Sequence, residues 1–288
     1  MSASYEALER LARERLPAAI AERWIKLLRP AVRLRHAAAG QPVVAQLGGN
    51  PSLHEDATWP EWDGHGPLTY VGSIDCEALA GIELQISLPR RGRLAFFYFD
   101  GQYDDAESLV IFQQPESLAG ARVLYLPPGL NTTVRASPRG IKPYPHIDLS
   151  GDRVATFPNP GHPALLREFL QAGDDRRTFL DHPVNAEAFV KALWEFETGP
   201  MHQVGGFGTP VQGPMEYEVA QAALGGAADW HDPALEREAA NWTLLAQIDS
   251  DNETDMMWGD AGVLYWMMRP ADLEARRFEA ASFTWQCH

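Results

Sequence analysis

The sequence places its densest group of potential metal ligands or acid–base groups in a polar loop that begins after Ile248. The carboxylates of this loop are Asp249, Asp251, Glu253, Asp255 and Asp260, which fall at positions 1, 3, 5, 7 and 12 of a twelve-residue window. That spacing is close to the carboxylate spacing of a calcium-binding hand. However, position 6 is Thr254 rather than the glycine that such a loop needs, and the apolar flanks favour strands over helices.

Two interpretations of this acidic loop stay open. In the first, a divalent cation is bound by four carboxylates, and calcium or magnesium is the expected ion because both prefer oxygen ligands. The proposed metal ligands are Asp249, Asp251, Asp255 and Asp260. In the second, the same side chains cap turns through backbone N–H groups and face water. The second interpretation is the simpler one, so we expect no bound cofactor.

A glycine-rich segment at residues 201–212 is the second candidate site. His202 precedes Gly205-Gly206, and the segment ends at Gln212. A histidine beside glycines can orient a ligand or exchange protons, because glycine lets a backbone come close. No Lys-Ser or Lys-Thr follows, and the dinucleotide fingerprint is incomplete, so nucleotide binding is not expected.

Tryptophans supply the remaining candidates for a binding surface. Trp258 could form the aromatic wall of a pocket with Asp249 or Asp260 as its polar group, or it could belong to a rigid Trp-Gly-Asp corner. Trp59 stands before Pro60 in a long polar loop, where it could bind a ligand or close the core. The full set of predicted ligand-binding residues is Trp59, His202, Gln212, Gln247 and Trp258.

No catalytic residue can be named from the sequence. The nucleophile motifs GxSxG and SxxK are absent, and Cys76 and Cys287 have no metal-ligand spacing. Catalytic groups can assemble from distant residues, so an enzyme in which His202 meets Asp249, Asp251 and Asp260 is retained as an alternative.

Composition and charge restrict the class of protein. With 288 residues and 45% hydrophobic content, the chain can bury a large core, and no apolar run reaches the roughly 18 residues that span a bilayer. Glu and Arg alternate near the N-terminus where a signal peptide would be apolar, so we expect a cytoplasmic protein. The net charge is −15, and the acidic residues dominate beyond residue 40, which argues against nucleic acid. The acidic charge fits a cationic partner, a bound metal ion or, as the simplest interpretation, solubility alone.

Hydrophobic periodicity predicts an α+β chain. The spacing of apolar residues indicates a helical hairpin at residues 1–30, followed by an α+β domain at residues 31–288. A mid-chain helical pair is expected at 163–170 and 185–196, and a Pro- and Gly-rich connector at 137–160 is expected to be irregular. Strands are expected at 32–36, 43–47, 68–74, 92–99, 109–112, 122–126, 132–136, 244–248, 263–268 and 282–287.

The strands on either side of the acidic loop have counterparts earlier in the chain. The alignment pairs Thr69 with Thr243, Ile74-Asp75 with Ile248-Asp249, Gly92 with Gly262, Leu94 with Leu264 and Phe96 with Trp266. It predicts an internal duplication of a strand–connection–strand unit. The second strand of each copy is apolar without alternation, so each should lie within a sheet covered on both faces. The first copy lacks the extra carboxylates, which makes the acidic loop a property of one half only.

Three motifs together resemble the YwqG-like family of bacterial proteins, a domain of unknown function. They are Gly48-Gly49-x-Pro51 through Trp59-Pro60 to Ile74-Asp75, His202-x-x-Gly205-Gly206 through Gln212, and Gln247-Ile248-Asp249 through Trp258-Gly259-Asp260-x-Gly262. The resemblance covers roughly residues 45–288 and departs from the pattern at Ser73, where a glutamine is expected. It implies a single α+β domain with extensive antiparallel sheet in two pseudo-duplicated halves. It brings no established activity, although some relatives lie beside secreted-toxin genes.

We therefore expect a non-catalytic binding or interaction protein, in an immunity or regulatory role, that recognises a protein partner through an aromatic and acidic surface. The alternative is a metal-dependent or small-molecule enzyme that uses the acidic loop and the glycine-rich segment. Neither the ligand nor the oligomeric state can be predicted from the sequence.

Overall fold

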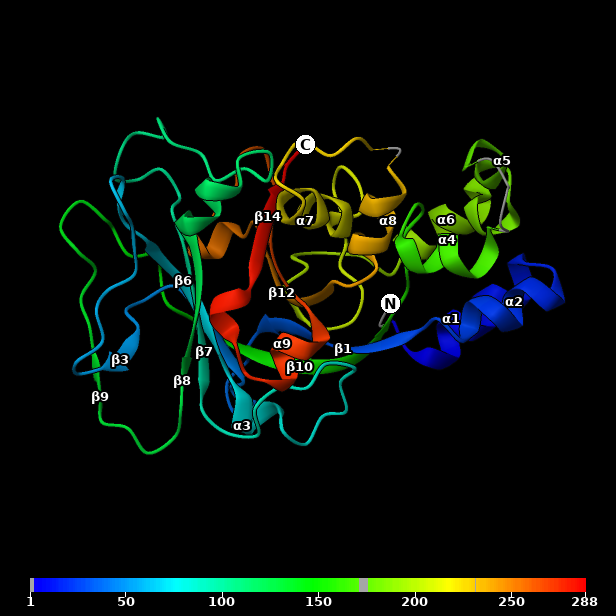
Figure 1. Cartoon of the computed structure of the whole chain (residues 1–288). Coiled ribbons are helices and arrows are strands. Elements are labelled where there is room, and N and C mark those ends of the chain that lie inside the picture. The colour runs from blue at the N-terminus through cyan, green and yellow to red at the C-terminus, as the bar shows by residue number, and fades with distance from the viewer. Residues whose placement is uncertain (1–2, 171–175, 231) are drawn as a thin grey trace.

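One antiparallel sheet organises the molecule. The computed structural model describes residues 3–170, 176–230 and 232–288, and ten strands of this part of the chain pair in the order β14-β13-β12-β11-β1-β10-β2-β6-β7-β8 (Figure 1). These strands are β1 (Arg29–His36), β2 (Ala45–Leu47), β6 (Thr69–Asp75), β7 (Arg93–Tyr98), β8 (Ala121–Leu126), β10 (Ile147–Thr156), β11 (Gln203–Val204), β12 (Thr243–Asp249), β13 (Val263–Met268) and β14 (Ser282–Gln286). Two small ribbons pair β3 (Ser52–His54) with β9 (Thr132–Val134), and β4 (Glu61–Trp62) with β5 (Gly66–Pro67).

The sheet consists of two related halves that meet at the long β1·β10 pair. Each half repeats one plan, because β10-β2-β6-β7-β8 corresponds strand by strand to β1-β11-β12-β13-β14. The registers agree in detail: Ile74 pairs with Leu94 as Ile248 pairs with Leu264, and each first strand carries a bulge, at Tyr70/Gly72 and at Leu244/Ala246. The predicted duplication is confirmed, together with the α+β class. The N-terminal β1 completes the second half, so the two halves are interleaved along the chain.

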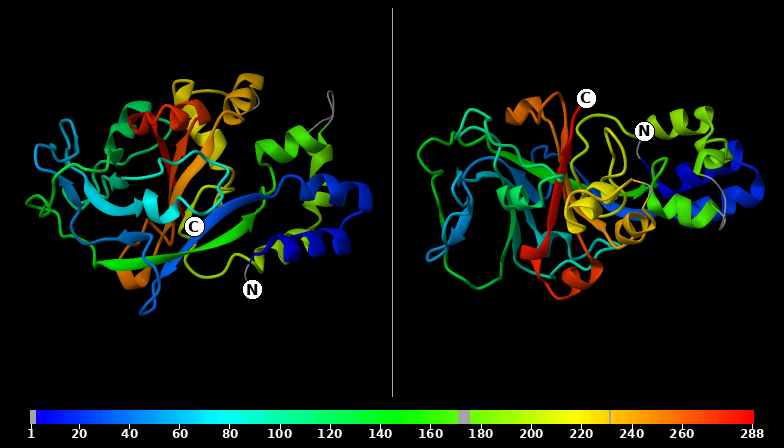
Figure 2. Two further views of the ribbon diagram at one scale, coloured as in Figure 1. Left: turned by 90° about the horizontal axis from the view of Figure 1, so that it is seen from below. Right: turned by 45° about the horizontal axis from the view of Figure 1, so that its top comes forward.

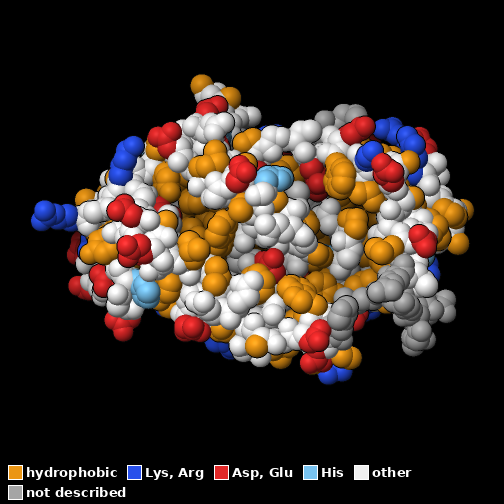
Figure 3. Space-filling model, turned by 90° about the horizontal axis from the view of Figure 1, so that it is seen from above, with side chains coloured by type: hydrophobic (Ala, Val, Ile, Leu, Met, Phe, Trp, Pro, Cys, Tyr) orange, Lys and Arg blue, Asp and Glu red, His pale blue; other side chains and the backbone are white. Residues whose placement is uncertain are grey.

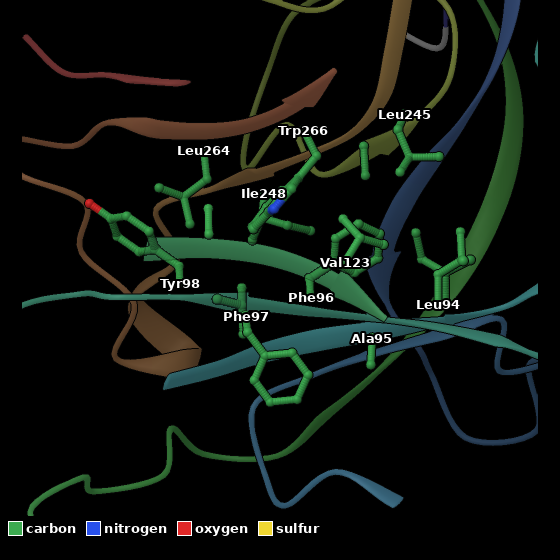
Figure 4. Close-up of a cluster of buried hydrophobic side chains, with 14 of the residues drawn as sticks. Leu94, Ala95, Phe96, Phe97, Tyr98, Val123, Leu245, Ile248, Leu264 and Trp266 are labelled. Atoms are coloured by element: carbon green, nitrogen blue, oxygen red, sulfur yellow. The ribbon is translucent and has the colours of Figure 1, made fainter. Parts of the chain in front are cut away.

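The two halves also face each other. Phe96 of β7 and Trp266 of β13 occupy equivalent positions, and their rings pack edge to face at 5.0 Å between centroids. Alternate residues of β7 point to opposite sides, so that Phe96 lies among Ile248, Leu264 and Trp266 while Phe97 points the other way (Figure 4). On that second side Trp59 covers Phe97 at 5.6 Å. Burial on both faces explains why β7 is apolar without alternation.

Helices gather at one end of the sheet and over its edge. They are α1 (Tyr5–Arg15), α2 (Ala18–Ile25), α3 (Cys76–Leu79), α4 (Pro163–Phe169), α5 (Arg176–Leu180), α6 (Glu187–Trp194), α7 (Met215–Ala223), α8 (Pro233–Ala239) and α9 (Pro270–Glu274). The hairpin α1–α2 packs with α4 and α6 around a second core that contains Trp24 and Phe189. Figure 2 shows β1 and β10 running side by side from this helical end into the sheet. We call α1, α2, α4, α5 and α6 the helical end.

Two local predictions are wrong. Residues 109–112 form no strand, because Ser117 Oγ donates to Ile111 O and accepts from Ile111 N, each at 2.9 Å, which satisfies this backbone without a sheet. The connector at 137–160 contains the ten-residue strand β10. Its Gly151 indicated a loop, but a Cβ there would lie 2.7 Å from Val32 and 2.9 Å from Val44, so close packing requires the glycine. No helix in the described residues is long and apolar enough to cross a membrane.

Candidate functional site

Three side chains from distant parts of the chain meet beside the acidic loop. Asp251 Oδ2 lies 2.6 Å from Nε2 of His36, the last residue of β1, and 3.1 Å from Nε2 of His202, which precedes β11. Pairing of β1 with both β10 and β11 brings the two histidines to the same place. We call His36, Asp251 and His202 the histidine–aspartate cluster. Its three ligand atoms lie within 4.8 Å of one another.

Contacts within its own loop hold Asp251 in place independently of the two histidines. Its Oδ1 accepts the N–H of Glu253 at 2.9 Å and so caps the short 3-10 turn η3 (Asn252–Thr254). Its backbone forms a bridge with Met256, whose side chain is in the core. The hydrogen bonds from His202 and then His36, outweighing burial, hold the pKa of this carboxyl well below its usual range. Asp251 is therefore an anion at neutral pH.

The hydrogen bonds of His202 determine which ring nitrogen carries its proton. The N–H of Asp249 donates to His202 Nδ1 at 3.1 Å, so in the neutral ring the proton is on Nε2, which donates to Asp251. A histidine that binds a metal through Nε2 needs a lone pair there and normally donates its other N–H to an acceptor. His202 has the opposite arrangement. The geometry thus favours a hydrogen-bonded cluster over a metal centre, although the residue types alone would suit a transition metal.

His36 is the part of the cluster that solvent reaches. Its side chain is 30% exposed, whereas that of His202 is 1% exposed. Its Nδ1 lies 3.2 Å from Glu253 Oε2, so both ring nitrogens face carboxylates. Sequence reasoning missed His36, because nothing in its neighbourhood shows that β1 joins the second half of the sheet.

The other predicted metal ligands have separate roles. Asp249 accepts the N–H of Met201 at 2.7 Å, and burial raises the pKa of its carboxyl. Asp255 is exposed in a left-handed conformation with φ 54°, and Asp260 is exposed with its carbonyl accepting the N–H of His288 at 3.0 Å. Within the described residues, the one group of His, Cys, Asp or Glu side chains with metal-site geometry contains only Asp251 of these four.

Gln247 and Gln212 occupy different environments. Gln247 is fully buried, accepts the N–H of Thr209 at 2.9 Å and donates to Met201 O. Gln203 and Gln286 brace the same glycine-rich segment, since Gln203 donates to Gly205 O and Phe207 O, and Gln286 accepts the N–H groups of Val211 and Gln212. Gln212 itself is exposed and donates to Cys287 O at 2.7 Å. Hydrogen bonds from buried glutamines therefore hold this segment, in which β11 is the regular part.

The two predicted tryptophans are core residues in the structure. Trp258 donates to Asp249 O at 3.2 Å and packs its ring on Tyr98 and Tyr144. Trp59 donates to Leu68 O at 2.8 Å behind the sheet. Both are buried, so the simpler interpretation, a plug and a rigid corner, describes them. The structure brings His202 together with Asp249, Asp251 and Gln247, but not with Trp59.

Comparison with protein families adds one result. The family model described as "Domain of unknown function (DUF1963)" matches residues 45–287, which is most of the chain. The chain belongs to this family. Membership of the more specific YwqG-like group stays a prediction. A search of curated proteins found no match.

The duplicated DUF1963 domain carries the histidine–aspartate cluster in one half only. By the sheet registers, Gly151 of β10 corresponds to His36, Ala45 of β2 to His202, and Glu77 to Asp251. The glycine pairs after β2 and β11 are kept, and each has positive φ, between 60° and 71°. The fold therefore needs the glycines in both halves but not the two histidines.

The same half of the DUF1963 domain buries carboxyls that make stability depend on pH. Glu218 of α7 accepts from Thr284 Oγ1 at 2.6 Å and from Gln286 at 2.8 Å, and burial raises its pKa to about 7. Burial likewise raises the pKa of Glu197 to about 7. A folded-state pKa above the unfolded value of about 4.3 means that the folded state binds protons more tightly. This stabilising contribution is complete below about pH 4.3 and is lost as pH rises through 7.

We expect Glu218→Gln to flatten this pH dependence. Between pH 5 and pH 8 the wild-type free energy of unfolding should fall more steeply than that of the variant, and the difference should be on the order of 2 kcal/mol across the range. Urea unfolding at each pH measures it. The exposed Glu274→Gln is the matched control and should follow the wild type. Parallel curves for wild type and Glu218→Gln would contradict the assignment.

A pocket of about 650 Å³ lies in the helical end of the chain, away from the cluster. Its apolar lining comes from α4, α5 and α6, namely Leu166, Phe179, Leu180, Val190 and Trp194. Glu187 and Lys191 of α6 supply the charged side chains of the lining. Figure 3, in which this end lies at the right, shows hydrophobic side chains exposed on its upper face. No residue of this pocket was singled out from the sequence as a ligand contact, because its apolar positions have the spacing of ordinary core helices.

Proposed function

We propose that this protein is a non-catalytic binding protein whose ligand occupies the pocket between α4, α5 and α6. The observation that carries the proposal is the pocket itself. Its volume of about 650 Å³ is within the range of small-molecule sites, roughly 300 to 1,000 Å³, and its lining is mainly apolar, as in such sites.

The chemistry near the histidine–aspartate cluster favours binding over catalysis. Ser250 Oγ, the nearest hydroxyl in the loop sequence, already donates to Gly262 O at 2.8 Å and accepts from Trp258 N at 2.9 Å. Burial raises the pKa of the Cys76 thiol to about 12, which keeps it protonated and unreactive. Asp251 and His202 are sealed from solvent and satisfied by each other. These contacts support a structural role for the cluster.

We also place the aromatic binding surface at the helical end, and not at the tryptophans named from the sequence. Trp59 and Trp258 are buried, whereas Trp194 beside the pocket is 52% exposed. A protein partner, an immunity or regulatory role and a cytoplasmic location stay parts of the proposal that rest on composition and on the YwqG-like resemblance.

A neutral hydrophobic dye tests the proposal. Nile red should bind saturably to the folded protein, and Trp194→Ala should weaken its affinity by roughly 2- to 12-fold, because an aromatic contact contributes about 0.5–1.5 kcal/mol. Trp230→Ala is the matched control, since Trp230 is 49% exposed but does not line the pocket. Fluorescence titration measures both. Absence of saturable binding, or equal losses in the two variants, would overturn the proposal.

A further inference from the structure

The charged residues at the pocket between α4, α5 and α6 restrict the ligand it accepts. Lys191 Nζ lies 2.5 Å from Glu187 Oε1, one helical turn away on α6. The two charges therefore neutralise each other, and the pocket lining carries no net charge. Both side chains of the pair are largely exposed, 80% for Glu187 and 64% for Lys191, so water screens them. A charged ligand would leave its own charge against the apolar lining, which costs free energy.

The remaining polar side chain of the lining is Asn185, which donates through Nδ2 to Phe179 O at 2.6 Å. Its Oδ1 is buried, and no group in the described residues hydrogen-bonds to it. The amide thus holds α5 against the start of α6. What the pocket offers a ligand is mainly apolar area, because Leu180 is 71% and Trp194 52% exposed. Water contact with these side chains is unfavourable, and a ligand that covers them gains about 25 cal/mol for each Å² removed from water.

We infer that the ligand is an uncharged apolar molecule, because the lining is apolar and its closed Glu187–Lys191 pair offers an ion no uncompensated charge. The inference rests on the proposed binding function and adds the ligand class. Leu180 and Trp194 cover the apolar body of the ligand, while Val190, Leu166 and Phe179 form the floor of the pocket. The ion pair stays closed while the ligand is bound.

Three probes with one apolar body test the ligand class. They are 1-adamantanol, 1-adamantanecarboxylate and 1-adamantylammonium, whose binding is measured by calorimetry. The neutral alcohol should bind at least about 10-fold more tightly than either ion, which corresponds to about 1.4 kcal/mol. Opening the ion pair should change this order predictably. Glu187→Gln leaves Lys191 unpaired and should improve binding of the carboxylate several-fold, Lys191→Gln should do the same for the ammonium, and neither should alter the alcohol.

The outcomes separate the ligand class from the proposed function. If Nile red binds at the Trp194 pocket but a charged probe equals or exceeds the alcohol in the wild type, the ligand class is wrong and the binding function stands. If neither Nile red nor any adamantane probe binds, both proposals fail. If Glu187→Gln and Lys191→Gln leave the order of the probes unchanged, the ion pair is not the selecting element. Both variants lie on an exposed helix face, so they should fold as the wild type does.

Discussion

Asp251→Asn is expected to lower the free energy of unfolding by about 3 kcal/mol, since each hydrogen bond to a charged group contributes about 1.5–3 kcal/mol. The asparagine keeps an oxygen for the η3 cap. Its Nδ2, however, would face His36 and His202, whose nitrogens are donors to Asp251 in the present arrangement. One buried donor is then left without an acceptor, which adds a desolvation cost. The variant should also lose stability less steeply below pH 4, because the low pKa of Asp251 contributes stability above about pH 3.9 that is lost in acid.

Asp260→Asn is the matched control for this variant. Asp260 is in the same loop and is exposed, so its substitution should change stability by less than about 0.5 kcal/mol. Urea unfolding of both variants at pH 7 and pH 4 makes the comparison. Equal small effects would show that Asp251 is merely one more surface carboxylate and would remove the histidine–aspartate cluster as a stabilising feature.

Gln247→Leu should destabilise the protein by about 3 kcal/mol. Leucine fills a similar volume but removes the acceptor of Thr209 N–H and the donor to Met201 O, and each unsatisfied buried group costs about 1–3 kcal/mol. The glycine-rich segment 201–212 should then exchange its amide hydrogens faster, because Gln247 is one of the buried side chains that hydrogen-bond to its backbone.

Gln212→Leu tests whether glutamine in this region is structural only when buried. Its side chain is exposed and makes a single hydrogen bond, to Cys287 O, so we expect a change within about 0.5 kcal/mol. Hydrogen exchange and urea unfolding apply to both variants. A loss in Gln212→Leu as large as that in Gln247→Leu would contradict the bracing role assigned to the buried glutamines.

The duplication could be predicted because both copies keep residues that sheet pairing requires. Ile74-Asp75 and Ile248-Asp249 end equivalent strands, and the apolar runs after Gly92 and Gly262 are each buried on both faces. Local sequence carries this information, since strand length and burial depend on neighbouring residues. The same signal gave the helical hairpin and the mid-chain helical pair.

Several features that were not predicted from the sequence depend on contacts between distant segments. His36 joins Asp251 only because β1 crosses into the second half of the sheet, and no local pattern encodes that crossing. Strand β10 was hidden by Gly151, which packs against Val32 and Val44. Helix α7 was not predicted because it is buried on all sides, and Glu216 and Glu218 are buried along with its apolar residues, so no separate polar face marks it as an amphipathic helix in sequence.

The carboxylate spacing of the acidic loop was informative only in part. It singled out Asp251, but an EF-hand loop wraps around its ion, and here η3 and the left-handed Asp255 send the side chains in different directions. The Glu187–Lys191 ion pair at the pocket has the i, i+4 spacing that is common on helix surfaces. The sequence alone therefore did not connect this pair with a ligand site.

We propose that the ligand site lies in the helical end and not at the histidine–aspartate cluster. The most direct test is to map the amide chemical-shift changes of the ¹⁵N-labelled protein during titration with 1-adamantanol. We predict that the saturable changes centre on α4, α5 and α6, with Leu166, Val190 and Trp194 among the largest, and that those near His36, His202 and Asp251 stay unchanged. Saturable changes confined to the histidine–aspartate cluster, with none in these helices, would contradict a ligand site in the helical end.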